Sequence, residues 1–281
     1  MVYHTFGLNY IRLKKMYNYT KSRLKNNLPG FYEFSKKIFH IILYILQRYI
    51  FGTGINKIIW RNKHFVDKNF RKFVNNDGND NRMQRQIVNV IKKYPNTNSL
   101  IDIGFGLGKD LKEIRKNYKK LNLYGVEINK KMFNELLSYF KHKKDYKVKL
   151  YNCTASKLDQ LENDKVDILL CNAVLMFITP NDIIETLKEF CRVTKKVIIL
   201  NEYNLDQDFV KSTIKEKDML FGNKNMYYKG GRWIYDYEKL FAELVPKANV
   251  KKYPSKKNNF VNDDWSTFGS LFVIELNKDK K

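Results

Sequence analysis

The chain has 281 residues, and its 53 Lys and Arg residues outnumber 29 Asp and Glu, for a net charge of +24. This length suits one α/β domain with an extension. The three cysteines lack the spacing of a metal site or a disulfide scaffold, and the chain opens without a signal peptide, so we expect a reduced, cytoplasmic protein. The positive charge comes mostly from lysine, whereas sites that read nucleic-acid bases favour arginine. We therefore discount a nucleic-acid partner.

Residues 1–74 form an extension rich in aromatic residues and lysine, and FSKKIFHIILYILQRYIF (34–51) is its clearest helix. Helical spacing gathers its polar side chains into one stripe, namely Lys36, His40, Tyr44, Gln47 and Arg48. Its apolar run is too short to cross a bilayer. Because the apolar face is wide, we expect it to pack on the rest of the chain or to cover a pocket. Peripheral attachment to a membrane surface and self-association are the alternatives, and the oligomeric state stays open.

The polar turn NNDGNDN (75–81) begins a second domain, residues 75–281. In LIDIGFGLGK (100–109), a short buried strand runs into three alternate glycines, and helical spacing follows. This is the first turn of a Rossmann-like unit, where glycine lets a ligand approach the backbone. The acid Asp102 favours a ligand that carries positive charge. A dinucleotide fits less well, because Lys109 takes the place of the last glycine in G-x-G-x-x-G.

Further strands and helices alternate along the chain. We expect strands at 121–128, 147–153, 166–172 and 196–202, with helices at 130–141 and 181–193. Glu127, near the end of the second strand, is placed to accept both hydroxyls of a ribose. Thr179 and Pro180 predict the start of the later helix, as its cap and its first helical residue.

Together these motifs resemble the class I S-adenosylmethionine-dependent methyltransferases, over about residues 83–276. LIDIGFGLG is similar to the family's first motif, YGVEIN to its second-strand acid, and VDILLCNAVLMFI and KKVIILNEYN to its fourth and fifth strands. GGRWIYDYEKLF and DDWSTFGSLFVIEL look like the last helix and the closing strands. The resemblance implies a Rossmann-like three-layer α/β sandwich. Its seven-stranded, mostly parallel sheet would have an antiparallel final strand, and the N-terminal helical extension would be added to it.

The same resemblance implies S-adenosylmethionine as the cofactor. Asp102 would orient the methionine end, Glu127 would hold the ribose, and Ile128 would touch the adenine. Thr154 stands where many relatives carry an acid for the adenine amino group, although local turn chemistry is an alternative role for it. The other implied contacts are Gly104, Phe105, Gly106, Gly108, Ala155 and Asn172.

Transfer of a sulfonium methyl group needs alignment above all, and it needs a base only when the acceptor is a weak acid such as a sugar hydroxyl. The candidates for that base are Glu202, Tyr203, Asp236 and His64, and we expect no metal site. The exit of the fourth strand reads NAVL rather than the Asn-Pro-Pro-Tyr type of nitrogen methylases, and it resembles small-molecule and saccharide-pathway enzymes. We therefore expect a small-molecule acceptor that is methylated on an oxygen, such as a saccharide or a related metabolite. An RNA methyltransferase and a non-catalytic cofactor-binding or membrane-surface module are the alternatives.

Overall fold

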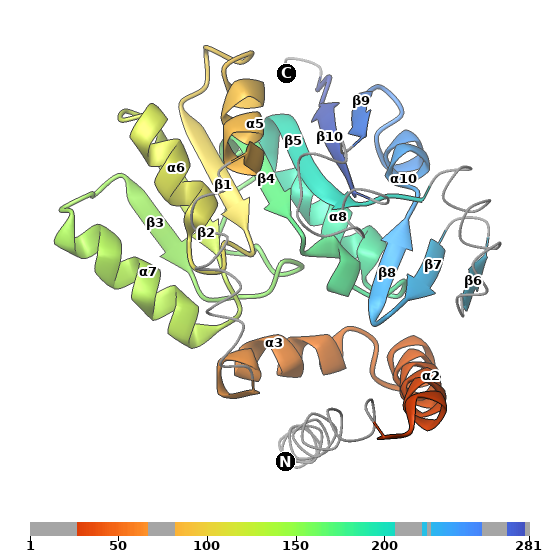
Figure 1. The fold of residues 1–281 in the computed structure, drawn as a ribbon. Coiled ribbons are helices and arrows are strands. Elements are labelled where there is room, and N and C mark those ends of the chain that lie inside the picture. The colour runs from red at the N-terminus through yellow and green to blue at the C-terminus, as the bar shows by residue number, and fades with distance from the viewer. Residues whose placement is uncertain (1–26, 67–81, 206–220, 224–225, 255–268, 279–281) are drawn as a thin grey trace.

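The computed structural model describes residues 27–66, 82–205, 221–223, 226–254 and 269–278, and a seven-stranded sheet forms its centre (Figure 1). The strands are β1 (Ser99–Ile103), β2 (Asn122–Val126), β3 (Val148–Tyr151), β4 (Val166–Asn172), β5 (Thr194–Tyr203), β9 (Asn249–Pro254) and β10 (Gly269–Glu275). Their order is β3-β2-β1-β4-β5-β10-β9. β10 is antiparallel to both of its neighbours, β5 and β9, and the remaining neighbours pair in parallel, so the predicted sheet and its reversed closing strand are confirmed.

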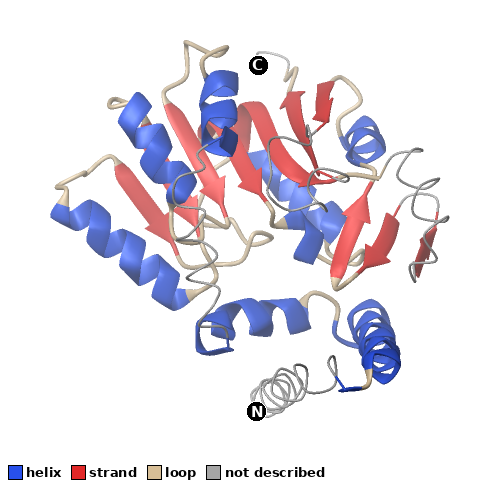
Figure 2. Cartoon of the chain, in the orientation of Figure 1, coloured by secondary structure: helices blue, strands red, loops and turns tan. Residues whose placement is uncertain are grey.

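Helices cover both faces of this sheet (Figure 2). On one face lie α5 (Arg82–Ile91), α6 (Lys109–Asn117) and α7 (Lys130–His142); on the other lie η3 (Leu175–Phe177), α8 (Ile183–Val193) and α10 (Tyr237–Leu244). Alternate residues of β4 face opposite layers: Ile168 and Leu170 join the first core, while Leu169 and Cys171 join the second. Burial on both faces explains why the strands read as continuous apolar runs.

A smaller antiparallel sheet, absent from the sequence-based prediction, stands beside the main one. It consists of β6 (Phe221–Asn223), β7 (Met226–Lys229) and β8 (Arg232–Tyr235). Tyr228 and Trp233 present their rings to Tyr44 of the extension, with centroids 5.4 and 5.7 Å away. This sheet therefore supplies the surface on which the extension rests.

The described part of the extension is a bent helical segment: α2 (Pro29–Ile45), the π-turn η1 (Leu46–Phe51) and α3 (Gly54–Val66). The helix predicted at 34–51 is present, but the prediction of its packing face is wrong, because the polar stripe faces the domain. Gln47 is fully buried there and accepts the indole N–H of Trp233 at 2.9 Å. Arg48 donates to Asn181 at 2.8 Å. The domain surface offers polar groups at this place, and the polar stripe satisfies them. The predicted boundary at 74/75 lies outside the described residues.

Contact with the extension also alters the start of α8. The helix begins at Ile183, two residues later than predicted, and the side chain of Thr179 does not cap it. Instead the Thr179 hydroxyl lies 2.9 Å from the Thr53 hydroxyl, and the Thr179 N–H donates to that hydroxyl at 3.0 Å. Thr179 therefore joins the two parts of the chain, a role that a local capping pattern cannot reveal.

Glu202, near the end of β5, fastens the loop that follows β4. Its fully buried carboxylate accepts backbone N–H groups from Val174, Leu175 and Met176 at 2.7, 2.9 and 3.4 Å. Burial raises the pKa of Glu202 to about 7, while the three N–H donors oppose that rise. The Glu202 carboxylate thus serves as the hydrogen-bond acceptor for the backbone of this loop.

Removing the Glu202 carboxylate should destabilise the fold. In Glu202→Ala the buried N–H groups lose their acceptor, which costs roughly 3 kcal/mol and lowers the melting temperature by about 6–12 °C. Thermal denaturation followed by circular dichroism measures this loss. The matched control is Glu185→Ala, because the Glu185 side chain is exposed and its ion pair with Lys188 contributes little. Equal melting of the two variants would contradict the structural role of Glu202.

Candidate functional site

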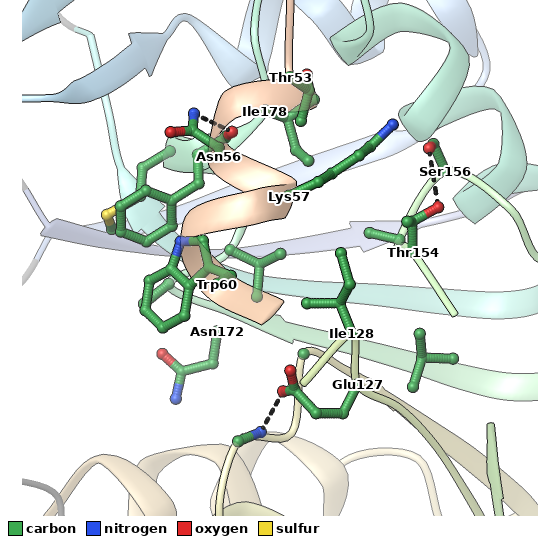
Figure 3. Close-up of a pocket in the computed structure, with 18 of the residues that line it drawn as sticks. Thr53, Asn56, Lys57, Trp60, Glu127, Ile128, Thr154, Ser156, Asn172 and Ile178 are labelled. Atoms are coloured by element: carbon green, nitrogen blue, oxygen red, sulfur yellow. Dashed lines mark hydrogen bonds between the residues drawn. The ribbon is translucent and has the colours of Figure 1, made fainter. Parts of the chain in front are cut away.

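A cavity of about 340 Å³ lies between the carboxyl ends of the central strands and α3 (Figure 3). The strands β1 and β4 lie side by side at the point where the strand order reverses, which is where α/β sheets bind ligands. The lining comes from the loop after β1, the end of β2, the segments 153–156 and 172–178, Tyr203, Arg232 and α3. The cavity is thus built by both the sheet and the extension.

One face of α3 and the turn before it form a wall of this cavity (Figure 3). The lining side chains are Thr53, Asn56, Lys57 and Trp60, at the helical spacing i, i+3, i+4 and i+7. Asn56 donates to the Phe177 carbonyl at 2.7 Å, and the Trp60 ring lies 4.8 Å from that of Phe177. Sequence reasoning singled out His64 and Trp60 in this segment as close enough to reach a pocket and missed Thr53, Asn56 and Lys57; the T-x-x-N-K-x-x-W spacing was the available signal.

The three glycines of the loop have two different tasks. All have positive φ, at +74° for Gly104, +54° for Gly106 and +74° for Gly108. A Cβ on Gly104 would lie 2.4 Å from Val174, and one on Gly108 would lie 2.3 Å from Leu136. A Cβ on Gly106 would meet nothing within 4 Å. Gly104 and Gly106 line the cavity, whereas Gly108 allows α6 and α7 to pack closely.

Glu127 ties this loop to the end of β2. Its carboxylate lines the cavity and accepts the Gly106 N–H at 2.9 Å and the Asn129 N–H at 2.8 Å (Figure 3). Burial raises the pKa of Glu127, and its backbone donors oppose that rise. The side chain of Asn129 in turn donates to the Trp60 carbonyl at 2.8 Å, so Glu127 and the wall formed by α3 are held in one frame.

Asp102 lies at the end of β1 and is only 1% exposed. Its Oδ2 has no hydrogen-bond partner among the described residues. Burial first, and then the charges of Asp110 and Glu127, raise the pKa of Asp102 well above its usual value. Three acids therefore gather at one place, and the one with an unpartnered oxygen favours a positively charged group.

Asn172, at the exit of β4, is held by a chain of side-chain hydrogen bonds. Its amide donates to Asp110 at 2.9 Å, and its oxygen accepts from Asn201 at 2.7 Å. Gln84 of α5 donates to the other oxygen of Asp110 at 2.7 Å. This chain fixes the orientation of Asn172, which lines the cavity as the sequence analysis expected of a cofactor-facing residue.

The side of the cavity that the resemblance assigns to adenine contains Ile128, Cys153, Thr154, Ala155 and Ser156. The hydroxyls of Thr154 and Ser156 lie 3.3 Å apart, so both of the roles considered for Thr154 are present in one place: it lines the cavity and makes a local turn contact. No carboxylate of the described residues lies in this stretch of the lining.

The remaining predicted residues lie in different places. The Phe105 ring is buried in the core beside α6 and α7 and does not line the cavity. Of the four base candidates, Tyr203 lines the cavity, with the Arg232 guanidinium 5.3 Å from its ring centroid. Asp236 caps α10 by accepting the Lys239 N–H at 3.0 Å. His64 lies in α3 with its side chain outside the described part, and Glu202 is bonded to the loop after β4.

Within the described residues, no group of three or more His, Cys, Asp or Glu side chains could hold a metal ion. The side chains and backbone that a ligand in the cavity would meet are the glycine loop, the Glu127 carboxylate, the amide of Asn172 and the wall contributed by α3. Asp102 and Asp110 do not line the cavity themselves; Asp102 lies buried behind the glycine loop.

Comparison with known proteins gives three results. Residues 100–197 match the family model described as a methyltransferase domain. None of the curated proteins matches the sequence significantly. Among solved structures, an S-adenosylmethionine-dependent methyltransferase from Clostridium acetobutylicum is similar, with a TM-score of 0.52 and 15% identity over 74% of this chain and 96% of that one.

Two other solved structures resemble the chain in fold. The plantazolicin methyltransferase BpumL, solved with SAH, gives a TM-score of 0.51 at 15% identity, over 89% of this chain and all of that one. The PH0226 protein from Pyrococcus horikoshii gives 0.50 at 17% identity, over 68% and 88%. Residues 100–197 thus match a methyltransferase domain in sequence, and the described chain shares the fold of solved S-adenosylmethionine-dependent methyltransferases, in agreement with the motifs of the glycine loop.

Proposed function

We propose that the chain is an S-adenosylmethionine-dependent methyltransferase, which transfers the methyl group of this cofactor to an oxygen of a small molecule, a saccharide or a related metabolite. The observation that carries this proposal is the wall formed by α3 across the carboxyl ends of the strands, which limits the cavity to about 340 Å³. This volume lies at the lower end of the range for small-molecule sites, roughly 300–1,000 Å³. A polymeric acceptor requires an open groove, whereas the lining here favours a compact one.

The residues at the site fit the cofactor. The unpartnered, buried Oδ2 of Asp102 suits an ammonium group, and the open space beside Gly106 suits a ligand that approaches the backbone. Glu127 would hold the ribose hydroxyls, and Ile128, Thr154 and the backbone around it would surround the base. When bound, the sulfonium supplies a methyl group that is already activated for in-line transfer.

Other residues would prepare the acceptor. Asn172, held by Asp110 and Asn201, offers a fixed amide toward the cavity, and Tyr203 lines it near Arg232. A tyrosine hydroxyl can accept a hydrogen bond from an acceptor hydroxyl and hold its oxygen in line with the methyl group, so Tyr203 is the residue to which we assign this positioning role. Trp60 and Phe177 exclude water on the opposite side.

The identity of the acceptor is tested by incubating the protein with a metabolite extract and methyl-labelled S-adenosylmethionine, followed by mass spectrometry of the labelled product. We expect the label on a small molecule, attached through oxygen. The same assay with Tyr203→Phe should lose turnover while keeping cofactor affinity. Label found only on a macromolecule would contradict the proposal.

An RNA acceptor is the second candidate, because the chain carries a net charge of +24. Phosphate contacts make binding steeply dependent on salt, so an RNA enzyme would lose affinity and turnover between low and physiological salt. We expect turnover of the small-molecule acceptor to persist across that range.

Glu127→Ala should weaken cofactor binding. The variant loses a charged hydrogen bond of roughly 1.5–3 kcal/mol, which corresponds to about 10- to 100-fold in affinity. Isothermal calorimetry with S-adenosylhomocysteine measures the change, and NAD should show no binding to either protein. Glu162→Ala, at an exposed position outside the cavity, is the control. Unchanged affinity in Glu127→Ala would remove the ribose role.

The glycines should separate ligand binding from folding. In Gly106→Val the added side chain enters the cavity, so the protein should fold, at a cost of about 1–2 kcal/mol for its positive φ, and lose cofactor affinity. In Gly108→Val the side chain enters the space of Leu136, so the fold itself should fail or melt much earlier. Melting curves and calorimetry on the two variants check this difference, and equal behaviour would contradict the assigned tasks.

A further inference from the structure

The outward face of α2 is apolar. Eleven large hydrophobic side chains are exposed in the described part of the chain, and eight of them lie between Leu28 and Ile50. We call six of these the outer stripe: Phe31, Phe34, Ile38, Ile42, Ile45 and Tyr49. Their spacing of three and four residues places them on one side of the helix, which runs along the edge of the molecule (Figure 1). Such concentration marks an interaction surface rather than scattered exposure.

The outer stripe cannot turn inward without breaking buried contacts. The opposite face of the helical segment holds the fully buried Gln47, bonded to Trp233 and Asn56, and the buried Leu43. Tyr44 packs on Trp233 from the same side. Gln47 is thus satisfied on the side that faces the domain, while the outer stripe faces away from it.

The sequence of the extension is strongly basic. Residues 1–74 contain 15 Lys and Arg against the two acids Glu33 and Asp67, so they carry +13 of the total of +24. The remaining 207 residues carry only +11. Lys36 and Lys37 lie on α2 itself. A helix with an apolar stripe and a dense basic charge has the two features that bind anionic bilayer surfaces.

We propose that α2 docks the chain on the surface of an anionic membrane, with the outer stripe inserted among the lipid headgroups. The charge favours this occupant over a second copy of the chain, because a contact between two copies would bring together two basic extensions, each with Lys36 and Lys37 on its α2. Among the described residues no single helix is long and apolar enough to cross a membrane; Pro29–Phe51 and Gly54–Asn62, bent by 115°, meet that test of length and composition only as a pair. The buried bonds of Gln47 and Asn56 keep both helices on the domain, so docking in the plane of the surface is the arrangement we infer.

The test is co-sedimentation of the full chain with phosphatidylcholine vesicles that contain roughly one third phosphatidylserine, compared with phosphatidylcholine alone. We expect binding to the anionic vesicles, weakening with salt. The variant Phe34→Ser, Ile38→Ser, Ile42→Ser should lose at least about 100-fold in vesicle affinity, because three apolar side chains leave the interface.

The matched control replaces the three exposed large hydrophobic residues of the described chain that lie outside the extension, in the variant Tyr139→Ser, Tyr146→Ser, Tyr253→Ser, and it should bind vesicles like the unchanged chain. Calorimetry with S-adenosylhomocysteine on all proteins shows that each is folded, and it tests the cofactor site separately. Absence of vesicle binding by the unchanged chain would overturn the proposal, as would equal binding by both variants. A dimer in sedimentation velocity that becomes a monomer in the α2 variant, without vesicle binding, would assign the outer stripe to a second copy.

Discussion

The amide of Gln47 is the contact on which the arrangement of the extension depends. Its oxygen accepts the Trp233 indole N–H, its nitrogen donates to Asn56, and Asn56 donates to the Phe177 carbonyl. This buried chain joins the small sheet, the extension and the loop after β4. If the extension moved away, the bonds of Gln47 to Trp233 and of Asn56 to Phe177 would break, and each polar group that stayed buried without a partner would cost about 1–3 kcal/mol. The wall of the cavity and the outward position of the apolar stripe both follow from it.

The buried acids of the domain divide into satisfied and unsatisfied ones. Glu202 is occupied by three backbone N–H groups and Glu127 by two, while Asp110 joins Gln84 and Asn172. These bonds shape the loops around the cavity before any ligand arrives. Asp102 is the exception, with one buried oxygen unpartnered among the described residues. Because these polar groups are already aligned, binding of a cation at Asp102 requires little reorganisation of the site, and the free-energy cost of that reorganisation is small.

Local patterns in the sequence predicted most of the sheet and the glycine loop. Buried strands such as 166–172 and the turn at Gly104 are set by neighbours in the chain, and those predictions are confirmed. The packing face of α2, the role of Thr179 and the small sheet were missed. The first two depend on partners more than 100 residues away in sequence, as in the contact between Gln47 and Trp233. The small sheet pairs within residues 221–235, where the motif GGRWIYDYEKLF indicated the last helix instead of short strands. The difference between Gly106 and Gly108 likewise depends on Leu136, which no glycine pattern contains.

The π-turn at Leu46–Phe51 sets the rotation of α2 relative to α3 about the helix axis. A π-turn holds one residue more than an α-helical turn, and one residue corresponds to a rotation of about 100° around a helix axis. Loss of a single residue from this turn would therefore rotate α2 against α3, so that Gln47 and Trp60 no longer met their partners together. Insertions and deletions that a surface loop tolerates are thus excluded here, and the length of this one turn couples the outer surface of the protein to the wall of its cavity.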